Sequence, residues 1–177
     1  MRTRVTAAAL GAILVMALAG CATPQSTEPT PTPAFSSEEE AFAAAEATYR
    51  AYVDALNQVD LSDPETFEDL YGWTVGELNA SDRKQFAEWH AQELTKSGEA
   101  KVQAVTEGRY DPESGEVAIQ ACYDVSGVDI LNAEGGSVVS SDRPDQQPLA
   151  ITLTPSPDSA TGFAIMSISA LSDEATC

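Results

Sequence analysis

The spacing of apolar residues changes twice along this chain. Residues 5–18 form an uncharged and mostly apolar run behind two positive residues, Arg2 and Arg4. After a polar stretch, apolar residues recur at steps of three and four, which predicts helices, and beyond Gly98 the step becomes two, which predicts strands. We therefore expect an export segment, then helices, then a sheet.

The first predicted helix begins after Ser36 and Ser37. Glu39 and Glu40 follow these serines at capping-box spacing, and the helical pattern continues to about Asn57. Its apolar stripe consists of Phe42, Ala45, Tyr49, Tyr52, Val53 and Leu56.

Two further helices are predicted before the sheet. Asp63-Pro64 opens a short one, in which Phe67, Leu70 and Tyr71 lie on one side. Ser81-Asp82 is expected to cap the third helix, and Ser97-Gly98 is expected to end it.

The remaining pattern predicts strands joined by turns. Asp111–Gly115 has the composition of a hairpin turn, and 155–158 of another. The strands are expected at residues 100–110, 117–125, 128–131, 137–140, 149–153 and 163–171.

This order of elements predicts one α+β domain over residues 38–177, with N-terminal helices packed on a curved antiparallel sheet. In its element order and length, the domain resembles the nuclear transport factor 2-like superfamily, the cystatin-like cone. The resemblance implies a long first helix that packs into a strongly bent sheet.

Leu18-Ala19-Gly20-Cys21 resembles the lipobox of bacterial lipoproteins. The resemblance implies a signal peptide at residues 1–20, cleavage between Gly20 and Cys21, and lipid such as palmitate on Cys21. Residues 21–37 then form the lipidated cysteine and a Thr/Pro-rich tether. The alternative is an ordinary signal peptide with a chance cysteine. The whole arrangement also resembles small actinobacterial lipoproteins, and it predicts a lipid-anchored protein on the extracytoplasmic face of the cell membrane.

The charge of the chain limits its partners. The formal net charge is −19, and it becomes about −21 once Arg2 and Arg4 leave with the signal. Such a protein does not bind nucleic acid through phosphate contacts. Anionic headgroups would repel it as well, so membrane attachment depends on the lipid. The charge favours either a cationic partner or metal, or simply a well-solvated surface.

Two cysteines remain after Cys21. Outside the cytoplasm a pair of thiols usually becomes a disulfide, so we expect Cys122 to pair with Cys177. Their spacing excludes a CxxC redox pair, and we expect no metal site, because the chain has a single histidine.

Candidate chemistry is sparse. Tyr49, Tyr52, Trp89 and His90 are the candidate lining of an apolar pocket, although core packing explains the aromatic residues equally well. The resemblance to the cone superfamily, whose enzymes often use a His or Asp base in the pocket and sometimes a tyrosine donor, implies His90 as a candidate base and Tyr49 or Tyr52 as a candidate donor. No local motif assigns these roles. Nucleotide, P-loop, serine-hydrolase and zinc-protease motifs are missing, so we expect no catalytic residue and no cofactor.

Three hypotheses follow. The first is a non-enzymatic lipoprotein that binds a small apolar ligand or a protein partner. The second is an isomerase- or hydratase-type enzyme with a base in its pocket. The third is a structural accessory of an envelope complex.

Overall fold

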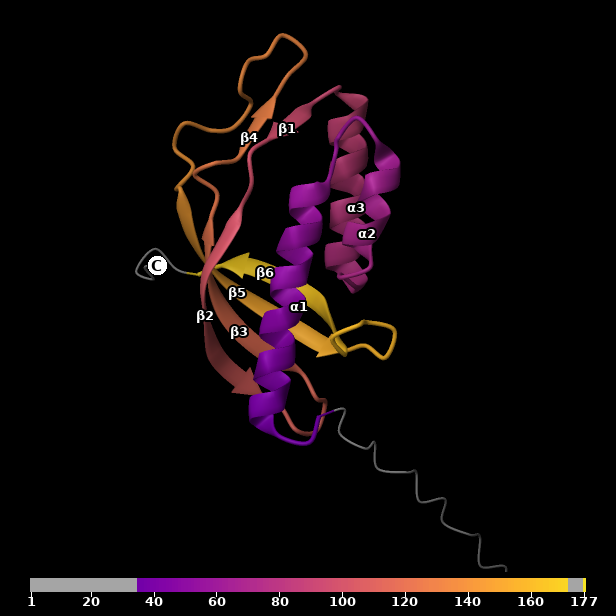
Figure 1. Ribbon diagram of the computed structural model, residues 1–177, viewed down its shortest axis with the longest axis vertical. Coiled ribbons are helices and arrows are strands. Elements are labelled where there is room, and N and C mark those ends of the chain that lie inside the picture. Colours follow the sequence, from indigo (N-terminus) through magenta and orange to yellow (C-terminus); the bar gives the residue numbers. More distant parts are fainter. Residues whose placement is uncertain (1–34, 172–176) are drawn as a thin grey trace, which may run out of the picture. The chain divides into compact units, whose positions relative to one another are not determined.

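The computed structural model describes residues 35–171 and residue 177 (Figure 1). Helix α1 (Glu38–Gln58) begins where the sequence predicts. The Ser37 hydroxyl accepts a hydrogen bond from the Glu40 amide at 3.1 Å, and the Glu40 carboxylate accepts one from the Ser36 amide at 2.9 Å. These bonds satisfy amides that a free helix end would leave without partners.

A short 3-10 turn and two helices follow α1. The turn η1 (Pro64–Thr66) starts after Asp63, whose side chain accepts from the Glu65 amide, and it leads into α2 (Phe67–Tyr71). Helix α3 (Gly76–Ala91) starts five residues before the predicted cap at Ser81-Asp82, so that prediction is wrong. The start is set by tertiary contact, because the Val75 amide donates to the carbonyl of Ile165 in the sheet at 2.9 Å.

The predicted end of the third helix at Ser97-Gly98 is also wrong. The helix ends at Ala91 in a Schellman motif, in which the Leu94 amide donates to the Trp89 carbonyl and the Glu93 amide to the His90 carbonyl. Glu93 takes the left-handed conformation, with φ of 55°, that usually favours glycine. Because a glutamate stands there, the sequence carries no signal for this end.

The main sheet has four antiparallel strands in the order β2-β3-β5-β6. A register shift lies between Val102 and Ala104 and another between Glu107 and Arg109, both in β2, and such bulges bend a strand (Figure 1). The bounds are β2 (Lys101–Tyr110), β3 (Val117–Asp124), β5 (Gln146–Pro155) and β6 (Phe163–Ala170).

A second sheet pairs β1 (Thr95–Ser97) with β4 (Asp129–Leu131). The sequence pattern did not predict β1, and the strand predicted at 137–140 is wrong. That segment makes a single bridge between Leu131 and Ser137. The Asn132 side chain accepts from the Gly136 amide at 2.8 Å, which favours a turn over a continued ladder.

The core lies between α1, α2 and one face of the main sheet. Helix α1 crosses this face, and α2 and α3 lie beside it (Figure 1). The most deeply buried large side chains are Tyr49, Leu61, Leu70, Ile119, Ile151, Leu153, Phe163 and Ile165. The protein therefore has the predicted α+β architecture, with helices packed on a curved antiparallel sheet.

Candidate functional site: an acidic groove

One hollow on the surface of the domain is a groove that encloses about 650 Å³ and opens to solvent. Three segments form it: the C-terminal half of α1, the region from η1 to Trp73, and the loop between β5 and β6. The lining residues are Ala51, Asp54, Ala55, Gln58, Thr66, Glu68, Asp69, Gly72, Trp73, Asp158, Ser159 and Ala160.

Charge of one sign surrounds this groove. Asp54, Glu68, Asp69 and Asp158 contribute exposed carboxylates, and no lysine or arginine lines it. Glu68 meets Arg83 at 3.3 Å, but both side chains are largely exposed, so the pair is weak. In the described part of the chain, the other three carboxylates have no ion-pair partner.

Apolar surface lies between the carboxylates. Trp73 is half-buried, Ala55 is buried and Ala51 is partly buried, so a partner in the groove would meet apolar groups flanked by negative charge. We call this feature, defined by the twelve lining residues, the acidic groove. It can bind a cationic and partly apolar group, but it presents no histidine, cysteine or buried acid for catalysis.

The domain interior holds a second group of polar side chains. Burial raises the pKa of Asp82 to about 6, an effect that a hydrogen bond from Thr74 partly offsets. The Oδ2 atom of Asp82 is buried and has no hydrogen-bond partner among the described residues. Burial raises the pKa of Tyr52 far above its usual range, and the negative charge of Asp82 adds to this shift.

Two more tyrosines belong to this interior group. Burial raises the pKa of Tyr123 to about 12 and that of Tyr49 higher still, and the rings of Tyr49 and Tyr52 stack with centroids 6.4 Å apart. Tyr49 is 1% exposed and Tyr52 8% exposed, so both rings are packed within the core.

The four residues of the predicted pocket do not meet in one place. The rings of Trp89 and Phe86 lie nearly perpendicular, with centroids 5.5 Å apart, in an aromatic cluster with α2. His90 is exposed, and its Nδ1 lies 2.8 Å from the Leu61 carbonyl oxygen. None of the larger hollows along the described residues is lined by Tyr49, Tyr52, Trp89 or His90.

The residues of the acidic groove, and Asp82 in the interior, were not predicted as site residues from the sequence. Glu68 and Asp69 are adjacent acidic residues, but they lie in the first turn of α2, where the helix dipole by itself favours negative charge. Asp82 was interpreted as a helix cap, whereas it lies within α3. Asp54 and Asp158 are far apart in the chain, so no local pattern links them.

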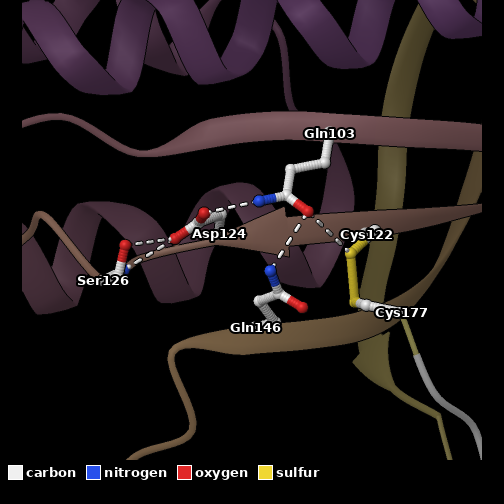
Figure 2. Close-up of a disulfide and its surroundings, with 6 residues drawn as sticks. All are labelled: Gln103, Cys122, Asp124, Ser126, Gln146 and Cys177. Atoms are coloured by element: carbon white, nitrogen blue, oxygen red, sulfur yellow. Dashed lines mark hydrogen bonds between the residues drawn. A yellow bond between two sulfur atoms is a disulfide. The ribbon is translucent and has the colours of Figure 1, made fainter.

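Figure 2 shows Cys122 of β3 joined to Cys177 in a disulfide, with their Cα atoms 5.2 Å apart. Gln103 on the neighbouring strand lies beside it, with Oε1 3.8 Å from the Cys122 sulfur. The same Gln103 donates to Asp124 at 2.6 Å and accepts from Gln146 at 3.2 Å. These contacts link β2, β3 and β5 at one end of the sheet.

The predicted lipidation site, Gly20-Cys21, lies outside the described residues. Within residues 35–171, no helix is long and apolar enough to cross a membrane. The same part of the chain, together with residue 177, contains no cluster of three or more His, Cys, Asp or Glu side chains placed to hold a metal ion.

Comparison with known proteins identifies no family for this chain. No protein-family model matches it, and neither does any curated protein. Among solved structures, it superposes on CagV, described as a VirB8 homolog of T4SS from Helicobacter pylori, with a TM-score of 0.46, 10% identity, and coverage of 72% of this chain and 96% of CagV.

Two other solved structures superpose over a similar length. The periplasmic domain of DotI gives a TM-score of 0.45 at 14% identity, covering 77% of this chain and 96% of its own. A periplasmic fragment of TraM gives 0.40 at 15%, covering 77% and 98%. Because all three TM-scores are below 0.5, these superpositions do not indicate the function of the chain.

Proposed function

We propose that this protein is an extracytoplasmic lipoprotein, anchored through Cys21, that serves as an accessory of an envelope complex by binding a basic segment of a protein partner. The acidic groove is the observation that supports this proposal. The proposal commits to a protein as the partner rather than to a small apolar ligand.

The chemistry of the groove favours a chain rich in lysine and arginine. The aliphatic stems of such residues pack on apolar surface while their charged heads reach outward. In the acidic groove, the stems would lie on Trp73 and Ala55, and the heads would reach the carboxylates of Asp54, Asp69 and Asp158.

A small apolar ligand fits this site poorly. Such ligands occupy concave sites that bury most of their surface behind apolar walls. The acidic groove is open, and four carboxylates surround its apolar strip. An extended segment can remain partly in solvent while its side chains contact the groove.

Binding of a short fluorescent peptide of lysine, alanine and leucine would test the proposal. We expect the full chain to bind this peptide and not a peptide in which glutamate replaces each lysine. Changing Asp54, Asp69 and Asp158 to Asn should weaken binding by about tenfold or more, because three uncompensated charges next to the ligand are lost.

A matched control changes Glu107, Glu113 and Glu134 to Gln. These residues are exposed and do not line the acidic groove, so the net charge changes equally while the groove is retained. We expect less than about a threefold loss of affinity, since solvent and salt screen distant charges. Equal losses in the two triple variants would show that only net charge matters, and would refute the groove as the site.

The lipid anchor needs its own test. Changing Cys21 to Ser should leave the protein without attached palmitate and move it from the membrane fraction to the soluble fraction. Retention of Cys21→Ser in the membrane fraction, without lipid, would contradict the anchor and leave the groove proposal unaffected.

A further inference from the structure

Phe35 is the only large apolar residue in the stretch 22–37, and it packs on the domain. Its ring stacks on Phe163 with centroids 4.5 Å and planes 14° apart. Phe163 begins β6 and is fully buried, and Phe35 itself is half-buried. Phe35, which precedes α1 in the sequence, is therefore packed against the sheet of the domain.

The loop between β5 and β6 is the partner of this ring. The Ser156 amide donates to the Gly162 carbonyl at 2.8 Å, and the Gly162 amide donates to the Ser159 carbonyl at 3.1 Å. Gly162 has a φ of 85°, and a Cβ atom added there would lie 3.0 Å from Cζ of Phe35. A side chain at position 162 would therefore crowd the Phe35 ring, which packs closely against this glycine.

A second contact ties the same loop to α1. The Thr161 and Thr48 hydroxyls lie 2.6 Å apart, and Thr48 is fully buried on α1. The Ser159 hydroxyl lies 3.1 Å from that of Thr161. Since Ser159 lines the acidic groove beside Asp158, these contacts hold one wall of the groove in place.

We infer that Phe35 is a positioning residue for the acidic groove: by packing on Gly162 and Phe163, it holds the loop 156–162 that forms a wall of the groove. The inference rests on the proposed function and deepens it, because Phe35 lies within residues 21–37, the predicted lipidated cysteine and tether, and relates that segment to the groove. Docking of Phe35 and occupation of the groove favour the same loop conformation. Each therefore strengthens the other, as linkage requires.

The test uses the full chain with Phe35→Ala and two measurements. Amide hydrogen exchange of Ser156, Ser159 and Gly162 should become about tenfold faster, while the strands of the sheet keep their protection, because only a local opening becomes easier. Affinity for the lysine-containing peptide should fall about three- to tenfold, because a looser loop must be ordered on binding.

Controls separate this role from general packing. Val138→Ala shortens an apolar side chain that is 51% exposed and does not line the groove, and it should change neither measurement. Phe35→Leu keeps an apolar contact and should recover part of both. Thr161→Val removes the hydrogen bond between this loop and Thr48. It should also speed loop exchange and weaken peptide binding, and it provides a test even if Phe35→Ala folds poorly.

The outcomes distinguish this inference from the proposed function. If the wild-type chain does not bind the peptide, the proposed function fails, and the inference fails with it whatever the exchange shows. If the wild type binds and Phe35→Ala leaves affinity unchanged, the coupling is refuted while the groove remains the proposed site. If loop exchange is unchanged as well, Phe35 does not hold the loop.

Discussion

The acidic groove and the domain interior both contain polar groups, but under opposite conditions. In the groove, carboxylates on exposed residues surround an apolar strip, and there is space for a partner. In the interior, burial raises the pKa values of Asp82 and three tyrosines. Tyr49 and Tyr52 are packed within the core, and Asp82 and Tyr123 are partly buried.

This difference bears on the enzyme hypothesis. An isomerase or hydratase needs a titratable group that faces a substrate-sized cavity. In this domain, the groups with shifted pKa values, Asp82 and the tyrosines, do not line the acidic groove. The groove, which has room for a partner, is lined by exposed carboxylates. Both regions therefore support the proposed binding role. The following experiments, from the largest expected effect to the smallest, test this difference between the groove and the interior.

Removing the disulfide should have the largest effect on stability. Cys122 and Cys177 are 55 residues apart, so changing both to Ser should lower the free energy of unfolding by about 4 kcal/mol in the loop-entropy model. Urea titration measures this loss. Peptide affinity of the folded variant should not change, because neither cysteine lines the acidic groove. Two free thiols in the exported protein would contradict the pairing.

Shortening Tyr49 tests whether the interior is filled. Tyr49 is 1% exposed, so Tyr49→Ala should leave a cavity and lower the free energy of unfolding by about 3 kcal/mol. Tyr49→Phe keeps the ring and should lose less than about 1 kcal/mol. A loss near zero for Tyr49→Ala in urea titration would indicate a hollow interior, and would revive the ligand-pocket hypothesis.

Asp82 should make stability depend on pH. Its pKa is raised to about 6 in the folded state, so the folded protein holds this proton more tightly than the unfolded chain. The contribution of Asp82 to the free energy of unfolding is therefore favourable below its pKa in the unfolded chain, and it is lost as the pH rises through about 6. Asp82→Asn should stabilise the protein at pH 8 by about 1 kcal/mol, a value reduced because the group is partly exposed, and should change little at pH 4.

Thermal or urea unfolding of both proteins at the two pH values measures that difference. The control is Asp54→Asn, which removes an exposed carboxylate of the groove. An equal gain for both variants at pH 8 would indicate relief of general repulsion, and would contradict a specific effect of burial.

The smallest effect on stability should come from the groove itself. Asp54→Asn with Asp158→Asn should change the free energy of unfolding by less than about 0.5 kcal/mol, since both residues are exposed and unpaired among the described residues. The same variant should still lose peptide affinity. A large stability loss without a change in affinity would reverse the roles assigned to the two regions.

Local patterns predicted the parts of the fold that depend on nearby residues. The Ser37–Glu40 cap, the stripe of α1 and the alternation in β3 are all encoded within a few residues of each other. The start of α3 was missed because a hydrogen bond from Val75 to the sheet sets it. Its end was missed because Glu93 occupies a position where the sequence signal would be glycine.

The candidate site was less predictable than the fold. The sequence by itself determined the acidic charge, the export and lipobox pattern, the helices-then-sheet order and the two cysteines of the domain, because composition and short periodicity are local properties. Only the tertiary structure decided that Asp54 and Asp158 line one groove, that Asp82 is partly buried, and that Phe35 packs on Phe163. These relations join residues far apart in the chain, and chain packing alone brings them together.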